Sequence, residues 1–361
     1  MAEPLKNMYN PTFFEGFGEV VNSVYPEFDN KQFQTLIFDD NWEARELKER
    51  MRHITLILGK LLPDDFPIAL SILMKVRDKL EEAFEYMFFP DFVEVYGLED
   101  FENSIKGLEA FTSLCSSEFA VRPFIVKYPK RMMVQMEKWA IDDNFHVRRL
   151  ASEGCRPRLP WAMALPAFKK DPAPILPILE QLKNDETDYV RRSVANNLND
   201  IAKDHPAIVL KIANQWIGQN KNLDWVVKHA TRTLLKQGNT TALMLFGFGD
   251  PTNFHIQDLE IQDTKVEIGS TTHFSFTLIN KEEKTAKVRL EYGIYFMKSN
   301  GKQNRKIFQI KEGNFEPNTP YEIKRKQHFK NLTTRKHYKG VHKLAIVVNG
   351  VEKAFVEFEL M

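Results

Sequence analysis

The chain has 361 residues, of which 43% are hydrophobic and 27% charged, a composition typical of a globular protein with about two domains. It contains no apolar run of about eighteen residues, so no transmembrane helix is predicted. The amino-terminal segment lacks the apolar core of a secretion signal. Two cysteines, Cys115 and Cys155, are too few for a disulfide framework or a cysteine zinc site. We therefore expect a protein of the reducing cytoplasm.

The formal net charge of +1 conceals an uneven distribution of charge along the chain. Residues 1–110 contain 11 Lys and Arg against 22 Asp and Glu. Residues 118–239 contain 20 basic against 13 acidic side chains, and residues 251–361 contain 19 against 13. Two basic segments in one chain can enclose a polyanion, although ordinary solvated lysines explain the same counts.

Residues 11–110 are predicted to form a helical scaffold. Leu, Ile and Met recur at helical spacing through residues 42–62, following a potential cap at Asn41. A second long helix is predicted through residues 66–88, ending before Pro90. Neither helix carries a recognisable catalytic motif.

Three later segments can be superimposed on one another: DNFHVRRLASEG, TDYVRRSVANNL and LDWVVKHATRTL. They align on Val147, Val190 and Val226, which are 43 and 36 residues apart. This period is typical of HEAT repeats, in which stacked helix pairs form a solenoid with a concave face. An Asp within the first two residues of each segment is predicted to cap the helix.

The same alignment predicts which side chains line the concave face. Arg149 superimposes on Arg192 and Lys228, and Glu153 superimposes on Asn196 and Arg232. A column of cations commonly binds phosphate groups. Arginines in such repeats also pair with an Asp of the neighbouring repeat, so both interpretations remain open. The carboxylate of Glu153 has no use in a purely phosphate-binding surface.

Residues 255–361 alternate apolar and polar side chains in about seven short strands. Turn signals such as Asn300-Gly301 and Asn349-Gly350 separate these strands. This pattern predicts an immunoglobulin-like β-sandwich after a helical domain of residues 1–240 and a linker of residues 241–254. Basic loops near residues 298–306 and 323–340 either contact nucleic acid or keep the protein in solution.

Four motifs together resemble the AlkC branch of the bacterial HEAT-repeat alkylpurine DNA glycosylases. They are SSEFAVRPF, NFHVRRLASEGCRPRLPW, DYVRRSVANNLNDIAKDHP and ALMLFGFGDP. The resemblance covers nearly the whole chain. It implies excision of N3-methylated purines, chiefly 3-methyladenine, from double-stranded DNA, with little or no base pocket. We accordingly expect a monomer of the bacterial cytoplasm that acts at the nucleoid, without membrane attachment, cofactor or metal.

The resemblance suggests roles for three residues in bond cleavage. Glu153 would stabilise positive charge on the deoxyribose and position a water molecule, with Glu118 as its partner, and the two roles can be exchanged. The two carboxylates are 35 residues apart, about one repeat, so they can face one cleft. Trp161 would present its ring to the cationic base or sugar. Predicted DNA contacts come from Arg122, Arg148, Arg149, Arg156, Arg192, Lys228 and Arg232.

Simpler structural explanations exist for each catalytic candidate. Glu153 is spaced to form a salt bridge with Arg149 or Arg156. Glu118 can stand at a helix amino terminus, where the helix dipole favours a carboxylate. Trp161 can fill a gap between repeats. If these explanations hold, the protein is a non-catalytic HEAT scaffold that binds DNA or a protein. A metal-dependent nuclease is disfavoured because the histidines of the helical part lack ligand spacing.

Overall fold

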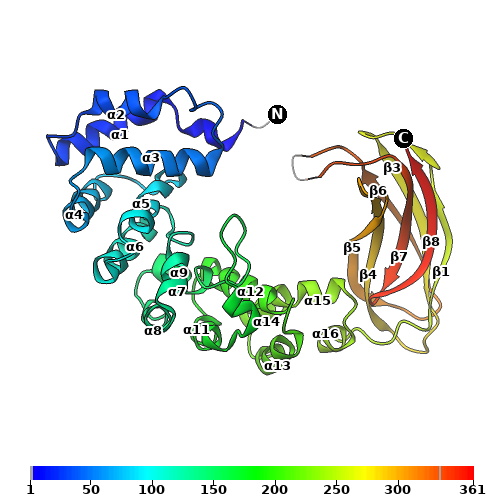
Figure 1. Cartoon of the computed structure of the whole chain (residues 1–361). Helices are drawn as coiled ribbons and strands as arrows, with labels where there is room; N and C mark the ends of the chain where they lie inside the picture. The colour runs from blue at the N-terminus through cyan, green and yellow to red at the C-terminus, as the bar shows by residue number, and fades with distance from the viewer. Residues whose placement is uncertain (1–2, 333–334) are drawn as a thin grey trace. The chain divides into compact units, whose positions relative to one another are not determined.

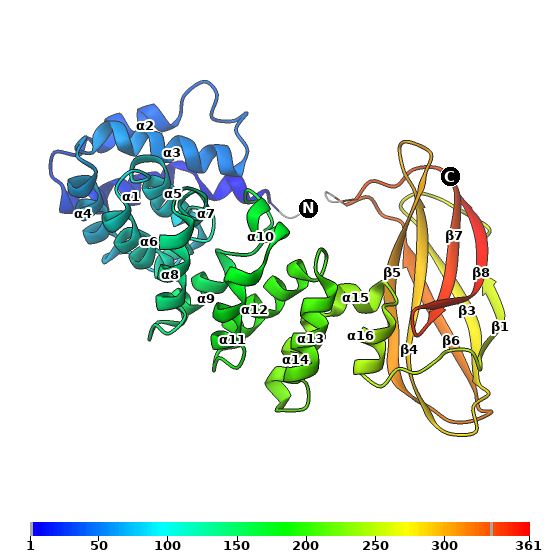
Figure 2. The same cartoon turned by 60° about the horizontal axis from the view of Figure 1, so that its bottom comes forward.

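The structure is a computed structural model that describes residues 3–332 and 335–361. The chain forms two compact units (Figures 1 and 2). The first contains residues 1–205 and 216–230, and the second contains residues 206–215 and 231–361. Within the described residues, no helix is both long and apolar enough to cross a membrane.

The first unit is built from helices that follow one another in chain order (Figure 1). The α-helices are α1 (Pro11–Val24), α2 (Asn30–Ile37), α3 (Leu47–Leu61), α4 (Phe66–Arg77), α5 (Phe88–Tyr96), α6 (Phe101–Cys115), α7 (Val121–Lys127), α8 (Pro129–Trp139), α9 (Phe145–Glu153), α10 (Pro166–Lys170), α11 (Leu176–Leu182), α12 (Asp188–Ile201) and α14 (Lys221–Ala230). Short 3-10 helices accompany them at η1 (Leu5–Met8), η2 (Phe84–Met87) and η3 (Ala173–Ile175).

The two long helices predicted near the amino terminus are shorter than expected. The first begins at Leu47, because a capping box formed by Glu46 and Glu49 starts α3, and Asn41 is not its cap. The second ends at Arg77, and a separate helix, α5, begins at Phe88. Pro90 therefore lies in the first turn of a helix, where a missing backbone N–H costs no hydrogen bond.

The three superimposed segments contain α9, α12 and α14, as predicted, but the third segment continues beyond Ala230 into a separate helix, α15 (Arg232–Lys236). The shared valines are buried in all three helices. The predicted Asp caps are wrong, since α9 is capped by Asn144, whose side chain accepts from the His146 backbone N–H, and α12 begins after Thr187. Helix α12 packs against both α9 and α14. The second helices of three successive repeats therefore lie side by side, as Figures 1 and 2 both show.

The second unit combines helices with two β-sheets. Its helices are α13 (Pro206–Trp216), α15 (Arg232–Lys236) and α16 (Thr240–Leu245). Its strands are β1 (Phe254–Ile261), β2 (Lys265–Val266), β3 (Thr271–Asn280), β4 (Ala286–Met297), β5 (Gln303–Phe315), β6 (Pro320–His328), β7 (Gly340–Val348) and β8 (Val351–Leu360). One sheet has the order β1-β3-β6, and the other has the order β2-β8-β7-β4-β5.

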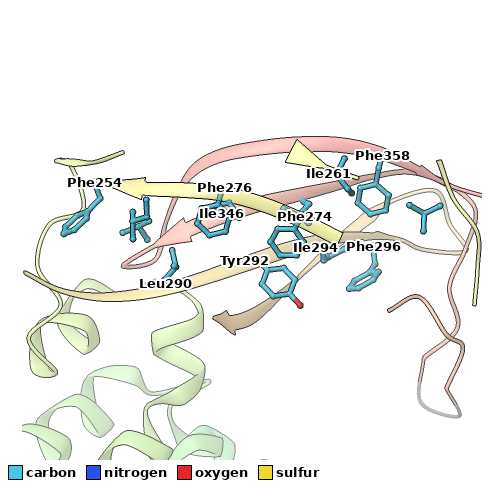
Figure 3. Packing of buried hydrophobic residues seen from close by; sticks show 14 of the residues in the cluster. Phe254, Ile261, Phe274, Phe276, Leu290, Tyr292, Ile294, Phe296, Ile346 and Phe358 are labelled. Atoms are coloured by element: carbon cyan, nitrogen blue, oxygen red, sulfur yellow. The ribbon is translucent and has the colours of Figure 1, made fainter. Parts of the chain in front are cut away.

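The two sheets pack through the apolar faces of their strands, which gives the predicted sandwich. Alternate residues such as Phe274, Leu290 and Ile346 are buried together (Figure 3). The predicted turn at Asn349-Gly350 joins β7 to β8, with both residues at positive φ. The second basic loop is shorter than predicted, because β6 continues to His328, and residues 333–334 of this loop lie outside the described part.

The segment predicted to be a linker, residues 241–254, includes most of α16 and lies on the five-stranded sheet. Lys287 of β4 donates to the Phe246 carbonyl at 2.9 Å, and Asn349 donates to the Gly249 carbonyl at 2.9 Å. A Cβ atom added to Gly350 would lie 2.4 Å from the Cα atom of Gly238, which follows α15. The backbone of the helical segment therefore touches the β7–β8 turn directly.

Candidate functional site

Glu118 lies in the short connection between α6 and α7. Its neighbour Ser116 ends α6 with a φ of +64° and donates its hydroxyl to Glu118 Oε2 at 3.1 Å. Positive φ is uncommon for a residue with a Cβ atom, so this turn is held in a strained conformation. The hydrogen bonds to Glu118 within the described chain end on Oε2. Oε1 therefore keeps its lone pairs for a further partner.

Arg149 of α9 joins the two candidate carboxylates. Its Nη1 donates to Glu118 Oε2 and also to Ser116 Oγ at 2.9 Å. Its Nη2 lies 3.5 Å from Glu153 Oε1. Burial opposes the charge of this guanidinium, but Glu153 and Glu118 outweigh it and raise the pKa of Arg149. Glu118 and Glu153 thus meet on one guanidinium, although they come from different repeats.

Glu153 is buried within a polar network at the end of α9. Its Oε1 accepts from Arg156 Nη1 at 2.6 Å, and its Oε2 accepts from Ser193 Oγ at 2.6 Å. Ser152 donates in turn to Ser193 at 2.6 Å. Asp200 of α12 accepts from Arg156 Nε at 2.9 Å. The ion pairing proposed as the simpler explanation for Glu153 is therefore present, and it holds this carboxylate in one orientation.

A cavity of about 410 Å³ opens beside Glu118. Its lining includes Glu82, Ser116, Glu118, His146, Arg149 and Tyr189. Burial lowers the pKa of His146, so its imidazole is neutral at pH 7. Two lining carboxylates, Glu82 and Glu118, then face a single cation, Arg149. This excess of negative charge suits a positively charged ligand.

Trp161 lies on an exposed loop rather than in this cavity. Its side chain is 61% exposed, its φ is +64°, and its carbonyl accepts from Lys48 Nζ at 2.7 Å. The following residues, including Met163, line a second cavity of about 150 Å³. Phe119 lines both cavities, so the cavity beside Glu118 and the cavity beside Met163 share this side chain. The contact of Trp161 with a base or sugar stays a prediction.

Among the predicted DNA contacts, Arg192 is the most accessible in the first unit. Its side chain is 53% exposed and pairs with Asp188 at 2.7 Å. Lys228 is half-buried on α14. Arg232 is half-buried and belongs to the second unit. The contact of these three cations with DNA stays a prediction.

Burial counts against two other predicted DNA contacts, Arg122 and Arg156. Arg122 is fully buried and donates to the carbonyls of Gly154 at 2.9 Å and Met163 at 2.7 Å. Burial lowers the pKa of Arg122 to about 10. A guanidinium in this place cannot reach a phosphate, so the prediction for Arg122 is wrong. The same argument counts against Arg156, which is also buried and is held by two carboxylates. Arg148 is half-buried and its guanidinium binds Asp185, so its contact with DNA stays a prediction.

The sequence interpretation missed several residues of the site. Asp200 lies 44 residues after its partner Arg156, and Ser193 lies 40 residues after its partner Glu153. Both separations are close to one repeat, and this spacing could have indicated the contacts. Tyr189 immediately precedes the shared valine of its repeat, at a position that is aromatic in all three aligned segments. Among the described residues, no group of three potential metal ligands occurs.

Two parts of the chain match known protein families. Residues 68–234 match the family described as DNA alkylation repair enzyme. Residues 255–361 match the immunoglobulin-like domain described for the C-terminus of the uncharacterised protein YhaZ. Protein YhaZ of Bacillus subtilis (strain 168) is 45% identical over 356 residues, which cover 99% of each chain.

A solved structure also resembles the entire chain. It is the alkylpurine DNA glycosylase AlkC of Pseudomonas fluorescens, bound to DNA that contains an abasic site analog. The two chains share 38% identity with a TM-score of 0.95, covering 99% of this chain and 100% of the other. The predicted fold, a helical solenoid followed by an immunoglobulin-like sandwich, is confirmed by this similarity.

Proposed function

Because the chain belongs to the AlkC family of DNA alkylation repair enzymes, we propose that it is a monofunctional DNA glycosylase for N3-alkylated purines. Its principal substrate is 3-methyladenine in duplex DNA. The enzyme acts as a monomer and hydrolyses the bond between the base and the deoxyribose without a cofactor.

The observation that carries this proposal is the cavity beside Glu118. Its excess negative charge favours a cation, and an N3-alkylated purine is positively charged in DNA. As the bond to the base breaks, positive charge moves onto the deoxyribose, where a fixed carboxylate stabilises it. A cavity lined by phosphate-binding cations alone would disfavour both the positive charge of the alkylated purine and the positive charge that develops on the deoxyribose.

Glu118 is the carboxylate we place against the reacting atoms. Its free Oε1 accepts a hydrogen bond from a water molecule and directs that water to C1′. The C1′–N9 bond breaks with its electron pair moving to the purine, which leaves as a neutral base. The water oxygen bonds to C1′, and its proton passes to the carboxylate and then to solvent. No strong acid is required, because the leaving base already carries positive charge.

Glu153 is the supporting carboxylate in this proposal. The sequence had indicated the water-positioning role for Glu153 with Glu118 as its partner, so the two roles are exchanged. Its carboxylate is held by Arg156 and Ser193 and reaches Glu118 only through Arg149. It therefore adds a fixed negative field and keeps Arg149 in place beside the sugar. Such preorganised groups stabilise developing charge without having to reorient during the reaction.

Release of free base from methylated duplex DNA tests the proposal, with no added metal. We expect the wild-type protein to release 3-methyladenine, and Glu118→Gln to slow this release about 100-fold or more. Glu102→Gln, at an exposed Glu paired with Arg131, is the matched control and should release base normally. Release by Glu118→Gln but not by Glu153→Gln would assign the water to Glu153. No release by wild-type protein would favour the non-catalytic scaffold.

A further inference from the structure

The three aligned repeats share an aromatic residue that the cation column does not explain. His146, Tyr189 and Trp225 each stand directly before the shared valine. Tyr189 is exposed on the first turn of α12, and Trp225 is exposed at the fifth residue of α14. Each ring meets a cation from the preceding repeat. Arg149 lies 4.8 Å from the ring centre of Tyr189, and Arg192 lies 5.3 Å from that of Trp225.

Helix α12 carries both Tyr189 and Arg192 and so links these two contacts into a row, which we call the stacked row: Arg149, Tyr189, Arg192 and Trp225. The stacked row crosses α9, α12 and α14, which lie side by side (Figure 2). On Trp225, the ring of His229 stacks at 5.0 Å with an interplanar angle of 8°. The rings are therefore fixed in orientation, and they hold the guanidinium groups in place by cation–π contact.

A guanidinium held in this way suits a phosphate group. Its planar fork binds two oxygens of a phosphate at once, and stacking on a ring reduces the freedom that binding would remove. The carboxylate partner of Arg192 is Asp188, four residues earlier on the same helix, and both side chains are 53% exposed. An exposed pair of this kind is weak and is readily exchanged for a phosphate.

The spacing of the stacked row also fits one strand of DNA. Packed helices stand about 8–10 Å apart, so consecutive cations are separated by a similar distance. The strand winds around the helix axis, so neighbouring phosphates are farther apart than the axial rise of about 3.4 Å per nucleotide, and the separation of the cations corresponds to about one or two nucleotides. The row begins at Arg149, which also holds Glu118 and Glu153, and continues away from them toward α14. It can therefore follow a strand outward from the reacting nucleotide.

We propose that the stacked row binds the sugar–phosphate backbone of one DNA strand next to the reaction site. Arg192 contacts a phosphate about one or two nucleotides from the one nearest Arg149. The exposed part of the Trp225 ring packs on a deoxyribose beyond it. The stacked row thus determines how the DNA strand is positioned relative to the reaction site, as well as how tightly the strand binds. The choice of DNA as the ligand rests on the proposed function. The binding of DNA to the stacked row can nevertheless be measured without any release of base.

Binding of the full-length protein to undamaged duplex DNA, measured by fluorescence anisotropy over a series of salt concentrations, tests the stacked row. Arg192→Gln should lower the slope of log affinity against log salt by about 1. Its matched control is Arg131→Gln. Arg131 is 52% exposed, lies 3.9 Å from the ring of Phe101 and pairs with Glu102, but belongs to α8. This control should leave the slope unchanged.

The aromatic part of the row is tested in the same assay. Trp225→Leu should weaken binding about threefold to fivefold, and Trp225→Phe should restore most of the affinity because it keeps a ring. Tyr96→Leu is the control, since Tyr96 on α5 is 38% exposed against 37% for Trp225. With methylated DNA, Trp225→Leu should raise KM and leave kcat unchanged.

The outcomes separate the two proposals. If Arg192→Gln and Trp225→Leu bind DNA like their controls, the stacked row is overturned, even when 3-methyladenine is released normally. If both variants bind more weakly but the wild-type protein releases no base, the stacked row stands and the glycosylase proposal fails. Absence of DNA binding by the wild-type protein at low salt would overturn the row and point to a protein partner.

Discussion

The hydroxyl of Ser193 offers a direct test of whether the orientation of Glu153 matters. Ser193 is buried and donates to Glu153 Oε2 at 2.6 Å, and Ser193→Ala removes this hydrogen bond. A hydrogen bond to a charged group contributes about 1.5–3 kcal/mol. Ser152 loses its bond to Ser193 but keeps a contact with the Arg149 carbonyl at 3.1 Å, which limits the further cost. We therefore expect a loss of about 2 kcal/mol in the free energy of unfolding.

Ser104→Ala is the matched control for this substitution. The buried Ser104 hydroxyl donates to the neutral carbonyl of Gly97, also at 2.6 Å, so its loss should cost about 0.5–1.5 kcal/mol. Urea unfolding measures both costs. Base release from methylated DNA should fall about tenfold in Ser193→Ala, equivalent to about 1.4 kcal/mol of lost transition-state stabilisation, and should not change in Ser104→Ala. Normal base release by a folded Ser193→Ala protein would refute the role given to the orientation of Glu153.

Three further predictions concern stability and buried charge. Gly350→Ala should destabilise the protein more than Gly301→Ala in urea unfolding. Both glycines have positive φ, +81° and +74°, so the backbone strain is similar. The added Cβ at Gly350 would lie 2.4 Å from the Cα atom of Gly238, whereas nothing lies within 4 Å of a Cβ at Gly301. Equal costs would show that the close approach is unimportant. Burial raises the pKa of Glu291, so the stability it contributes is present below the unfolded pKa and is lost as pH rises through the folded pKa. Relative to wild type, Glu291→Gln should therefore become more stable as the pH rises above the unfolded pKa of Glu, about 4.3, and a pH-independent difference would contradict this. Arg122→Gln should lower the melting temperature, because two backbone carbonyls lose a charged donor, and should leave the salt dependence of DNA binding unchanged. A reduced salt slope in this variant would restore Arg122 to the DNA contacts.

The repeat helices and the sandwich follow from local patterns. The spacing of Val147, Val190 and Val226 predicted three equivalent helices, because apolar residues at helical spacing must face a common core. Alternation of apolar and polar residues, with the Asn349-Gly350 turn, predicted the strands and one hairpin. Helix ends were predicted less well. The pattern through residues 66–88 continues across the break after Arg77, since periodicity alone does not show where a chain turns.

The pairing of Glu153 with Arg149 and Arg156 was predicted from the spacing along one helix, but the hydrogen bonds from this network to Ser193 and Asp200 of α12 were not. The position of Glu153 among cations marked it as unusual, and the distance of one repeat brought Glu118 near it, as the structure shows on Arg149. The burial of Arg122 could not be predicted, because an arginine on an amphipathic helix reaches either solvent or backbone carbonyls with the same sequence spacing.

The amino-acid sequence by itself therefore determined the repeat period, the fold class of both domains and the set of charged and aromatic residues from which a site can be built. Only the tertiary structure decided which of these groups are buried and paired. It enclosed Glu153 between Arg156 and Ser193, left one oxygen of Glu118 facing a cavity, and stacked Arg192 on Trp225 of the next repeat. The physical reason is that burial and pairing depend on contacts between helices one repeat apart, whereas periodicity depends on contacts within a single helix or strand.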